Sequence, residues 1–202
     1  MTDAALIACG LAYKAQPGAK GDTWDRIVSV YVWGVEFDPS PPSKMIYWNH
    51  GVHLWLKNHV ALRMVKKGER LSTAQNMITF GVSAFWHGFY PFYYIMFFMA
   101  SLFAETCKDI YRARSLFAGI PDTVNFVLAH FFVTLAMNYF GVSLCCLTFE
   151  KGWNFMKGTW SFVYILVPLT FVLIKMAGIV GYAKKLEAKK KAAKDGETKK
   201  DK

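Results

Sequence analysis

A single histidine, His87, stands in a long stretch of sequence without formal charge. Residues 72–104 contain no Asp, Glu, Lys or Arg, and His87 is the one side chain among them that can take up a proton near neutral pH. Ionisable groups are costly at membrane depth and tend to be functional there. This imidazole is suited to act as a general base that activates a hydroxyl group. The alternative is a neutral histidine that is hydrogen-bonded inside a helix bundle.

Asn49 is the second residue whose chemistry fits such a reaction. Its side-chain amide offers two hydrogen-bond donors and one acceptor. Beside a reacting carbonyl group, the amide can stabilise an oxyanion or orient a substrate. The alternative is an ordinary hydrogen bond on a helix surface. His130, in another uncharged stretch, has the same two interpretations as His87 but lies in no comparable motif.

Three further histidines lie close together without forming a metal-binding pattern. His50, His53 and His59 give only one pair spaced by a helical turn, and no Cys or nearby carboxylate completes a ligand set. We therefore expect no metal and no bound cofactor. The sequence also contains no GxSxG nucleophile turn, phosphate-binding loop or HExxH motif.

The elements that position these residues are predicted to be membrane-spanning helices. Charged residues are absent from three stretches, 72–104, 123–149 and 158–174. About 20 apolar residues cross a bilayer as a helix, so each stretch is long enough or nearly so. Across the chain 54% of residues are hydrophobic and only 19% are charged, and soluble cores do not need uncharged runs of this length. The predicted fold is all-α, a polytopic transmembrane helical bundle.

Composition divides the chain into three parts. Residues 1–44 are predicted to be an apolar start followed by a loop, residues 45–182 to be the transmembrane core, and residues 183–202 to be a basic tail that is a frayed helix or disordered. In the core we expect a helix over 45–67. Its apolar stripe, with Asn49 one turn from His53 beside it, is formed by Trp48, Val52, Trp55 and Leu62.

The remaining core is predicted to contain a broken segment and two spans. Pro91 removes a backbone donor and clashes with the preceding turn, so residues 71–104 should break just after His87 and Gly88. Two spans are expected after the break, over residues 123–148 and 159–182, separated by a short loop at residues 150–157.

The formal net charge of +10 is placed where a membrane protein carries it. Nine lysines and four acids lie in residues 184–202, and six basic residues and one acid lie in residues 44–70. Basic segments beside apolar spans are typical of cytoplasmic flanks that contact anionic headgroups, which argues against a nucleic-acid partner. With the tail in the cytoplasm, residues 150–157 are predicted to be lumenal and residues 105–121 cytoplasmic. The segment 71–104 must then cross twice or re-enter.

Two motifs follow one another along the chain. The first contains Trp48, Asn49, Trp55, Leu56, Lys57 and Arg63. The second is Ser83-Ala84-Phe85-Trp86-His87-Gly88, followed by Pro91 and Tyr94. In this order they resemble the membrane-bound O-acyltransferases, and most closely the carboxy-terminal half of their lysophospholipid acyltransferase branch. The flanking segments that fit the same branch include Trp24, Asp25, Glu36 and residues 105–112. The resemblance runs from about residue 10 to about residue 182.

The resemblance implies a multi-helix membrane fold in which the His and the Asn face a buried reaction chamber. Carried over, His87 is the general base and Asn49 the second catalytic residue. Acyl-CoA would enter from the cytoplasm as co-substrate, and a lysophospholipid from the bilayer. Further substrate contacts are expected at Trp48, Trp55, Lys57, Arg63, Ser83 and Trp86. Lys57 and Arg63 would meet phosphates, or alternatively only reach to the membrane interface.

The last residues, Lys199-Lys200-Asp201-Lys202, resemble a dilysine retrieval signal, which predicts the endoplasmic reticulum membrane with a cytoplasmic carboxy-terminus. Family members are roughly twice as long as this chain, and their amino-terminal spans have no counterpart in it. Three alternatives therefore remain beside lysophospholipid acylation. They are acylation of a sterol, diacylglycerol or protein; a non-catalytic truncated membrane fragment; and a transporter built on broken helices.

Overall fold

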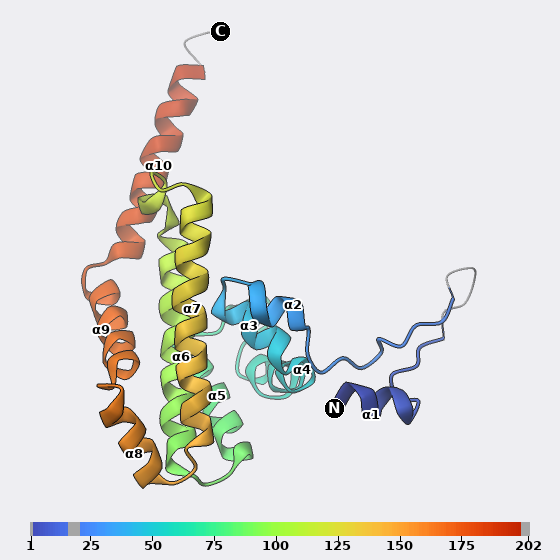
Figure 1. The fold of residues 1–202 in the computed structure, drawn as a ribbon. Helices are drawn as coiled ribbons and strands as arrows, with labels where there is room; N and C mark the ends of the chain where they lie inside the picture. Colours follow the sequence, from blue (N-terminus) through green and yellow to red (C-terminus); the bar gives the residue numbers. More distant parts are fainter. Residues whose placement is uncertain (1, 16–20, 199–202) are drawn as a thin grey trace.

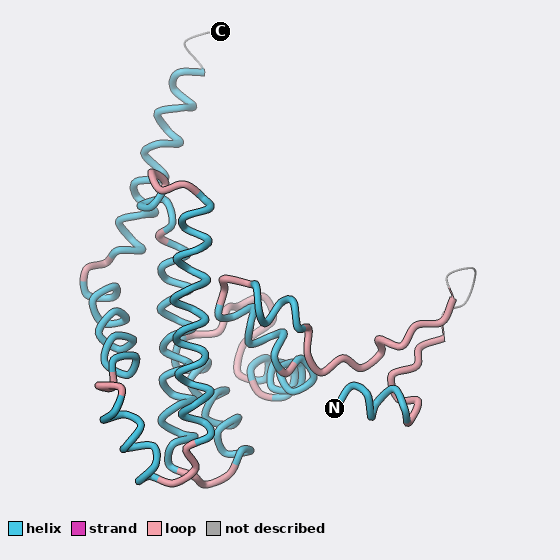
Figure 2. Tube along the Cα trace, viewed as in Figure 1, coloured by secondary structure: helices cyan, strands magenta, loops and turns pink. Residues whose placement is uncertain are grey.

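The structure, a computed structural model, describes residues 2–15 and 21–198, and its regular elements over this range are helices joined by loops, with one isolated β-bridge between Lys14 and Thr23 (Figures 1 and 2). The all-α prediction is confirmed for this part of the chain. The α-helices are α1 Thr2–Ala8, α2 Val32–Phe37, α3 Pro41–Trp48, α4 His50–His59, α5 Thr73–His87, α6 Pro91–Arg112, α7 Asp122–Cys145, α8 Phe149–Gly158, α9 Phe162–Met176 and α10 Ile179–Thr198. Two short 3₁₀ helices are η1 Ala61–Arg63 and η2 Arg114–Phe117.

The core of the molecule lies where α6 and α7 run side by side, with α5 and α9 against α6 (Figure 1). Phe103 of α6 meets Phe140 of α7 edge to face, with ring centroids 5.8 Å apart. Tyr164 of α9 packs on Tyr139 of α7 at 5.3 Å. Small buried residues on α6, such as Ala100, let the neighbouring helices approach closely.

The break between α5 and α6 lies where the sequence predicts it. A capping box starts α5: the Ser72 hydroxyl accepts from the Gln75 backbone N–H, and the Gln75 side chain accepts from the Ser72 N–H. Gly88 ends the helix with φ +117°, a conformation that other residues rarely adopt. Pro91 then opens α6 at its first position, where no backbone donor is needed.

The single helix predicted over 45–67 is wrong, because the chain breaks at Asn49 (φ −138°, ψ 68°). The backbone N–H of His50 donates to the carbonyl of Ser29 at 2.9 Å instead of continuing the helical pattern. The N–H of Tyr31 donates in turn to the carbonyl of Tyr47 at 3.0 Å. The preceding segment thus competes for the backbone groups of this helix and divides it into α3 and α4.

Two expectations for the carboxy-terminal third also need correction. Residues 150–157 form α8 rather than a loop, because the Thr148 hydroxyl accepts the Lys151 N–H and caps a helix. The expected span over 159–182 is divided into α9 and α10 at Gly178, which has φ +60°. The tail, predicted as frayed helix or disordered, is helical as far as Thr198.

Among the described residues, α7 is the helix that is long and apolar enough to cross a membrane by itself. The pair α8 and α9 passes the same test together, but the two helices are bent by 79° at their junction. An all-helical bundle with one such span and one bent pair is therefore the observed architecture. The larger number of crossings stays a prediction.

Gly152 of α8 fits directly against Phe92, which is fully buried near the start of α6. A Cβ atom at residue 152 would overlap the Phe92 ring. We expect Gly152→Ala to lower the free energy of unfolding by about 1–3 kcal/mol, because overpacking displaces α8. The measurement is the thermal unfolding midpoint of purified protein in detergent. Gly158→Ala, in the same helix with open space around it, is the control, and equal midpoints would contradict the prediction.

Candidate active site

His87 is the last residue of α5, and its ring lies against the start of α6. The imidazole is 5.7 Å from the Tyr93 ring and 5.0 Å from the Phe97 ring, measured between ring centroids. The side chain is otherwise exposed. The turn at Gly88 therefore places the imidazole on an aromatic wall with an open side, whereas the resemblance implies a buried chamber.

Asn49 lies in the break between α3 and α4 and is exposed, as is the neighbouring Trp48. Its backbone carbonyl accepts the N–H of His53 at 2.8 Å and so starts α4. Within the described residues, no hydrogen bond or ring contact joins Asn49 directly to His87. The break therefore places Asn49 outside a regular helix, with its side chain exposed.

Two tryptophans connect the elements that carry the two motifs. Trp55 of α4 packs edge to face on Trp86 of α5, with ring centroids 5.0 Å apart. Trp86 directly precedes His87, and Trp55 lies six residues after Asn49. Both rings keep about half of their surface exposed. The structure therefore brings the two motifs to one place through their tryptophans.

The other predicted contact residues are divided between the surface and the core. Lys57, in the last turn of α4, and Arg63, in η1, are exposed and free to meet a phosphate. Ser83 is buried on α5, one turn before His87, and faces the bundle. Its position suits support of the helix that holds His87 better than direct contact with a substrate.

The three histidines of α4 are His50, His53 and His59, and the first of them packs on an aromatic ring. His50 lies edge-on to Tyr31 at 5.2 Å. Burial lowers the pKa of His53, and the charges of Lys57 and His50 lower it further, which favours the neutral imidazole at pH 7. In the part of the chain that the structure describes, no three His, Cys, Asp or Glu residues are grouped to hold a metal ion.

Comparison with known proteins shows the family to which this chain belongs. Residues 1–149, which include both Asn49 and His87, match the model of the membrane-bound O-acyltransferase family. This chain belongs to the membrane-bound O-acyltransferase family. The predicted resemblance is thereby confirmed.

Several relatives of this family member are named as lysophospholipid acyltransferases. The chain is 29% identical over 185 residues to the lysophospholipid acyltransferase of Saccharomyces cerevisiae, and the match covers 87% of this chain and 30% of that protein. It is 30% identical to lysophospholipid acyltransferase 2 of Arabidopsis thaliana, covering 86% and 38%, and 28% identical to the lysophospholipid acyltransferase of Schizosaccharomyces pombe, covering 88% and 35%. The chain thus spans about a third of the length of these relatives, which corrects the expectation that family members are roughly twice as long as it.

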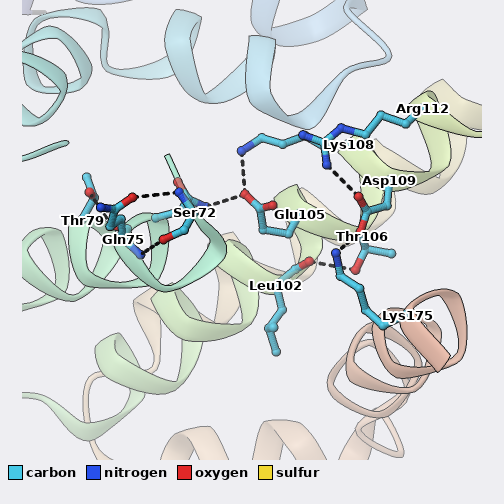
Figure 3. Close-up of polar contacts among 11 residues, drawn as sticks. Ser72, Gln75, Thr79, Leu102, Glu105, Thr106, Lys108, Asp109, Arg112 and Lys175 are labelled. Carbon is cyan, nitrogen blue, oxygen red and sulfur yellow. Dashed lines mark hydrogen bonds and ion pairs between the residues drawn. The ribbon is translucent and has the colours of Figure 1, made fainter. Parts of the chain in front are cut away.

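A network of polar side chains on α5, α6 and α9 was not predicted from the sequence of this O-acyltransferase family member (Figure 3). Glu105 and Asp109 are buried on α6, and each pairs with a basic residue three positions later: Lys108 Nζ lies 2.7 Å from Glu105, and Arg112 lies 2.8 Å from Asp109. Two other helices join it. Asn76 of α5 donates to Glu105 at 3.1 Å, and Lys175 of α9 lies 2.6 Å from Asp109.

The network ties three helices together at the end of α6 that is far from His87. With 22 residues, α6 is roughly 33 Å long at 1.5 Å per residue. The acid-base spacing of three was visible in the sequence as a signal for ion pairs along one helix. The bond to Lys175, 66 positions after Asp109 along the chain, had no such signal.

Proposed function

We propose that this chain provides the catalytic His and Asn of a bundle that transfers a fatty acyl group from acyl-CoA to the free hydroxyl of a lysophospholipid. The observation that carries the proposal is the family match over both motifs, together with relatives named for lysophospholipid acylation over most of this chain. The open side of His87, opposite its contacts with Tyr93 and Phe97, leaves room for a reacting hydroxyl.

In the proposed reaction His87 acts as the general base. Its imidazole takes the proton from the lysophospholipid hydroxyl, whose oxygen attacks the carbonyl carbon of the thioester. The C–S bond breaks, CoA leaves as the thiolate, and the imidazolium returns its proton to that sulfur. A placed base supplies about 10²–10⁴ in rate, and holding both substrates together supplies much of the rest.

The other residues would bind and orient the substrates. The Asn49 amide would donate to the carbonyl oxygen as negative charge develops on it. Trp48, Trp55 and Trp86 offer exposed aromatic surface beside the two motifs. The exposed cations of Lys57 and Arg63 would pair with phosphates of CoA or of the lipid headgroup.

The proposed setting is a multi-pass bundle in the endoplasmic reticulum membrane with the basic tail in the cytoplasm. Support comes from the membrane-bound family, from the span at α7 and from the lysines of α10. The dilysine sequence at residues 199–202 lies outside the described residues.

A chimera tests the activity because this chain spans about a third of its relatives. The full chain replaces the segment it matches in the Saccharomyces cerevisiae relative, and the resulting yeast chimera is expressed in cells that lack that relative. Membranes are then given labelled acyl-CoA and a panel of lysophospholipids, a sterol and diacylglycerol. We expect labelled phospholipid. A membrane-inserted chimera that acylates only the sterol or diacylglycerol, or no acceptor, would contradict the proposal.

The tryptophan pair gives a second prediction in the same chimera. We expect Trp55→Ala and Trp86→Ala each to lower acyl transfer about tenfold, because each removes the ring contact that holds the two motifs together. The double variant should be hardly worse than either, which corresponds to a coupling of about 1.4 kcal/mol, the equivalent of one tenfold loss. Rates of labelled phospholipid formation measure this, and Phe131→Ala, an exposed ring on α7, combined with Trp86→Ala provides the additive control. Fully additive losses for the tryptophan pair would refute the coupling.

A further inference from the structure

The short helix α8 has three distinct faces along its ten residues. One face, with Gly152, Phe155 and Met156, packs on the bundle, where Gly152 meets Phe92 and the Phe155 ring lies 4.8 Å from Tyr139. Another face is polar and exposed, and it consists of Glu150, Lys151, Asn154 and Lys157.

The third face of α8, between the other two, is aromatic and exposed. Phe149 and Trp153 lie one turn apart, with stacked rings 6.1 Å from centroid to centroid, and 56% and 46% of their surface is accessible. Lys157 Nζ lies 5.6 Å over the Trp153 ring, which brings a cation to the edge of the aromatic face. Aromatic rings beside lysines that reach outward are typical of the boundary between lipid and water.

The direction of α8 fits the same boundary. Three residues separate α8 from α7, the membrane-span candidate, and α8 meets α9 at 79°. The sharp turn is made by Trp160 and Ser161, both in the left-handed region with φ +55° and +50°. Trp160 is 86% exposed there. Figure 1 shows α8 at one end of the bundle and α10 at the other.

The two ends of the bundle differ in chemistry. At the α8 end, the turn between α5 and α6 adds exposed aromatic residues, with Phe89 78% accessible, and Phe92 joins that turn to α8 through its contacts with Phe149 and Gly152. The opposite end carries Arg112, Arg114, Lys175, Lys184 and Lys185. The roughly 33 Å of α6 between them is close to the 30 Å thickness of bilayer hydrocarbon.

We propose that α8 lies in the plane of the membrane, at the lipid–water boundary on the side opposite the lysine-rich tail. Phe149, Trp153 and Trp160 enter the boundary between headgroups and acyl chains, and the polar face of α8 meets water. This proposal goes beyond acyl transfer and does not depend on it. It also places the turn that carries His87 at the same side of the bilayer.

Spin-label scanning of the full chain in phosphatidylcholine vesicles tests the proposal. Single cysteines at the exposed α8 positions 149, 150, 151, 153, 154 and 157 are introduced after replacement of Cys9, Cys107, Cys145 and Cys146, and the positions packed on the bundle are left intact. The accessibility of each label to oxygen and to a water-soluble nickel chelate is measured. We expect positions 149 and 153 to favour oxygen and positions 150 and 154 to favour nickel, with no drift along the helix.

A steady drift from water to lipid along α8 would overturn the proposal in favour of a spanning helix. Nickel access at every position would overturn it in favour of a helix in water. Labels at exposed positions of α7 provide the control, and their accessibility should change steadily between water and lipid along the helix, as in a membrane span. If every α7 position were accessible to water, no lipid–water boundary would lie beside α8, and the proposal would be refuted. In addition, an impermeant maleimide should reach Asn154→Cys and Lys185→Cys from opposite sides, and labelling of both from one side would contradict it.

Discussion

Replacing His87 with alanine is expected to lower acyl transfer by the yeast chimera by about 10²–10⁴, the usual contribution of a general base. Alanine cannot take the proton from the attacking hydroxyl. The stability of the bundle should hardly change, because the imidazole is exposed and its ring contacts among the described residues are with Tyr93 and Phe97. The measurement is the initial rate of labelled phospholipid formation at saturating acyl-CoA, with chimera abundance in the membrane checked in parallel.

His130→Ala is the matched control for this experiment. His130 lies on α7, where its ring stacks near Phe126 at 6.1 Å, and it is outside both motifs. We expect that variant to retain the activity of the unmodified chimera within a few-fold. If His87→Ala keeps the unmodified rate, or if both histidine variants lose it equally, the assignment of His87 as the base is wrong.

Replacing Asp109 with alanine is expected to lower the free energy of unfolding by about 1–3 kcal/mol. Asp109 is 2% exposed and pairs with both Arg112 and Lys175 (Figure 3). Its loss leaves two cations without their partner and cuts the ion pair between α6 and α9. The effect should stay below that of a fully buried pair, because the Arg112 and Lys175 side chains keep 42% and 47% exposure and can turn to water.

Thermal unfolding in detergent, followed by circular dichroism, measures this loss as a lower midpoint. Glu187→Gln, at an exposed acid on α10, is the control and should leave the midpoint unchanged. Lys175→Met with Asp109→Ala should cost less than the two single changes together, because they remove one interaction. Purely additive losses would show that the pair does not join the two helices.

Where backbone chemistry is local, the sequence predicted the fold correctly. The break after His87 follows from Gly88 and Pro91, whose conformational limits act within a few residues. The break at Asn49 has a distant cause, because its neighbours hydrogen-bond to Ser29 and Tyr31. A helical pattern alone contains no information about such a competitor.

In the candidate site, too, local features could be predicted from the sequence and tertiary contacts could not. The motif residues and their chemical roles could be proposed from residue type and order. The two motifs meet through Trp55 and Trp86, whose rings are in contact although they are 31 positions apart in the chain. The sequence pattern gives no signal for this tertiary contact. Similarly, α8 was predicted as a loop from its glycines, whereas packing of Gly152 on Phe92 makes that glycine part of a helix interface.

The ion pair between Asp109 and Lys175 has a consequence for biogenesis. As a 15-residue helix, α9 is roughly 22 Å long, which is shorter than the hydrocarbon layer it would have to bridge. During synthesis α9 emerges well after α6, so the Asp109 carboxylate, already paired with Arg112, is in place when Lys175 arrives. Lys175 therefore meets a carboxylate that is already in place, and a ribosome stalled before residue 162 would leave Asp109 with Arg112 alone of the two cations that pair with it here.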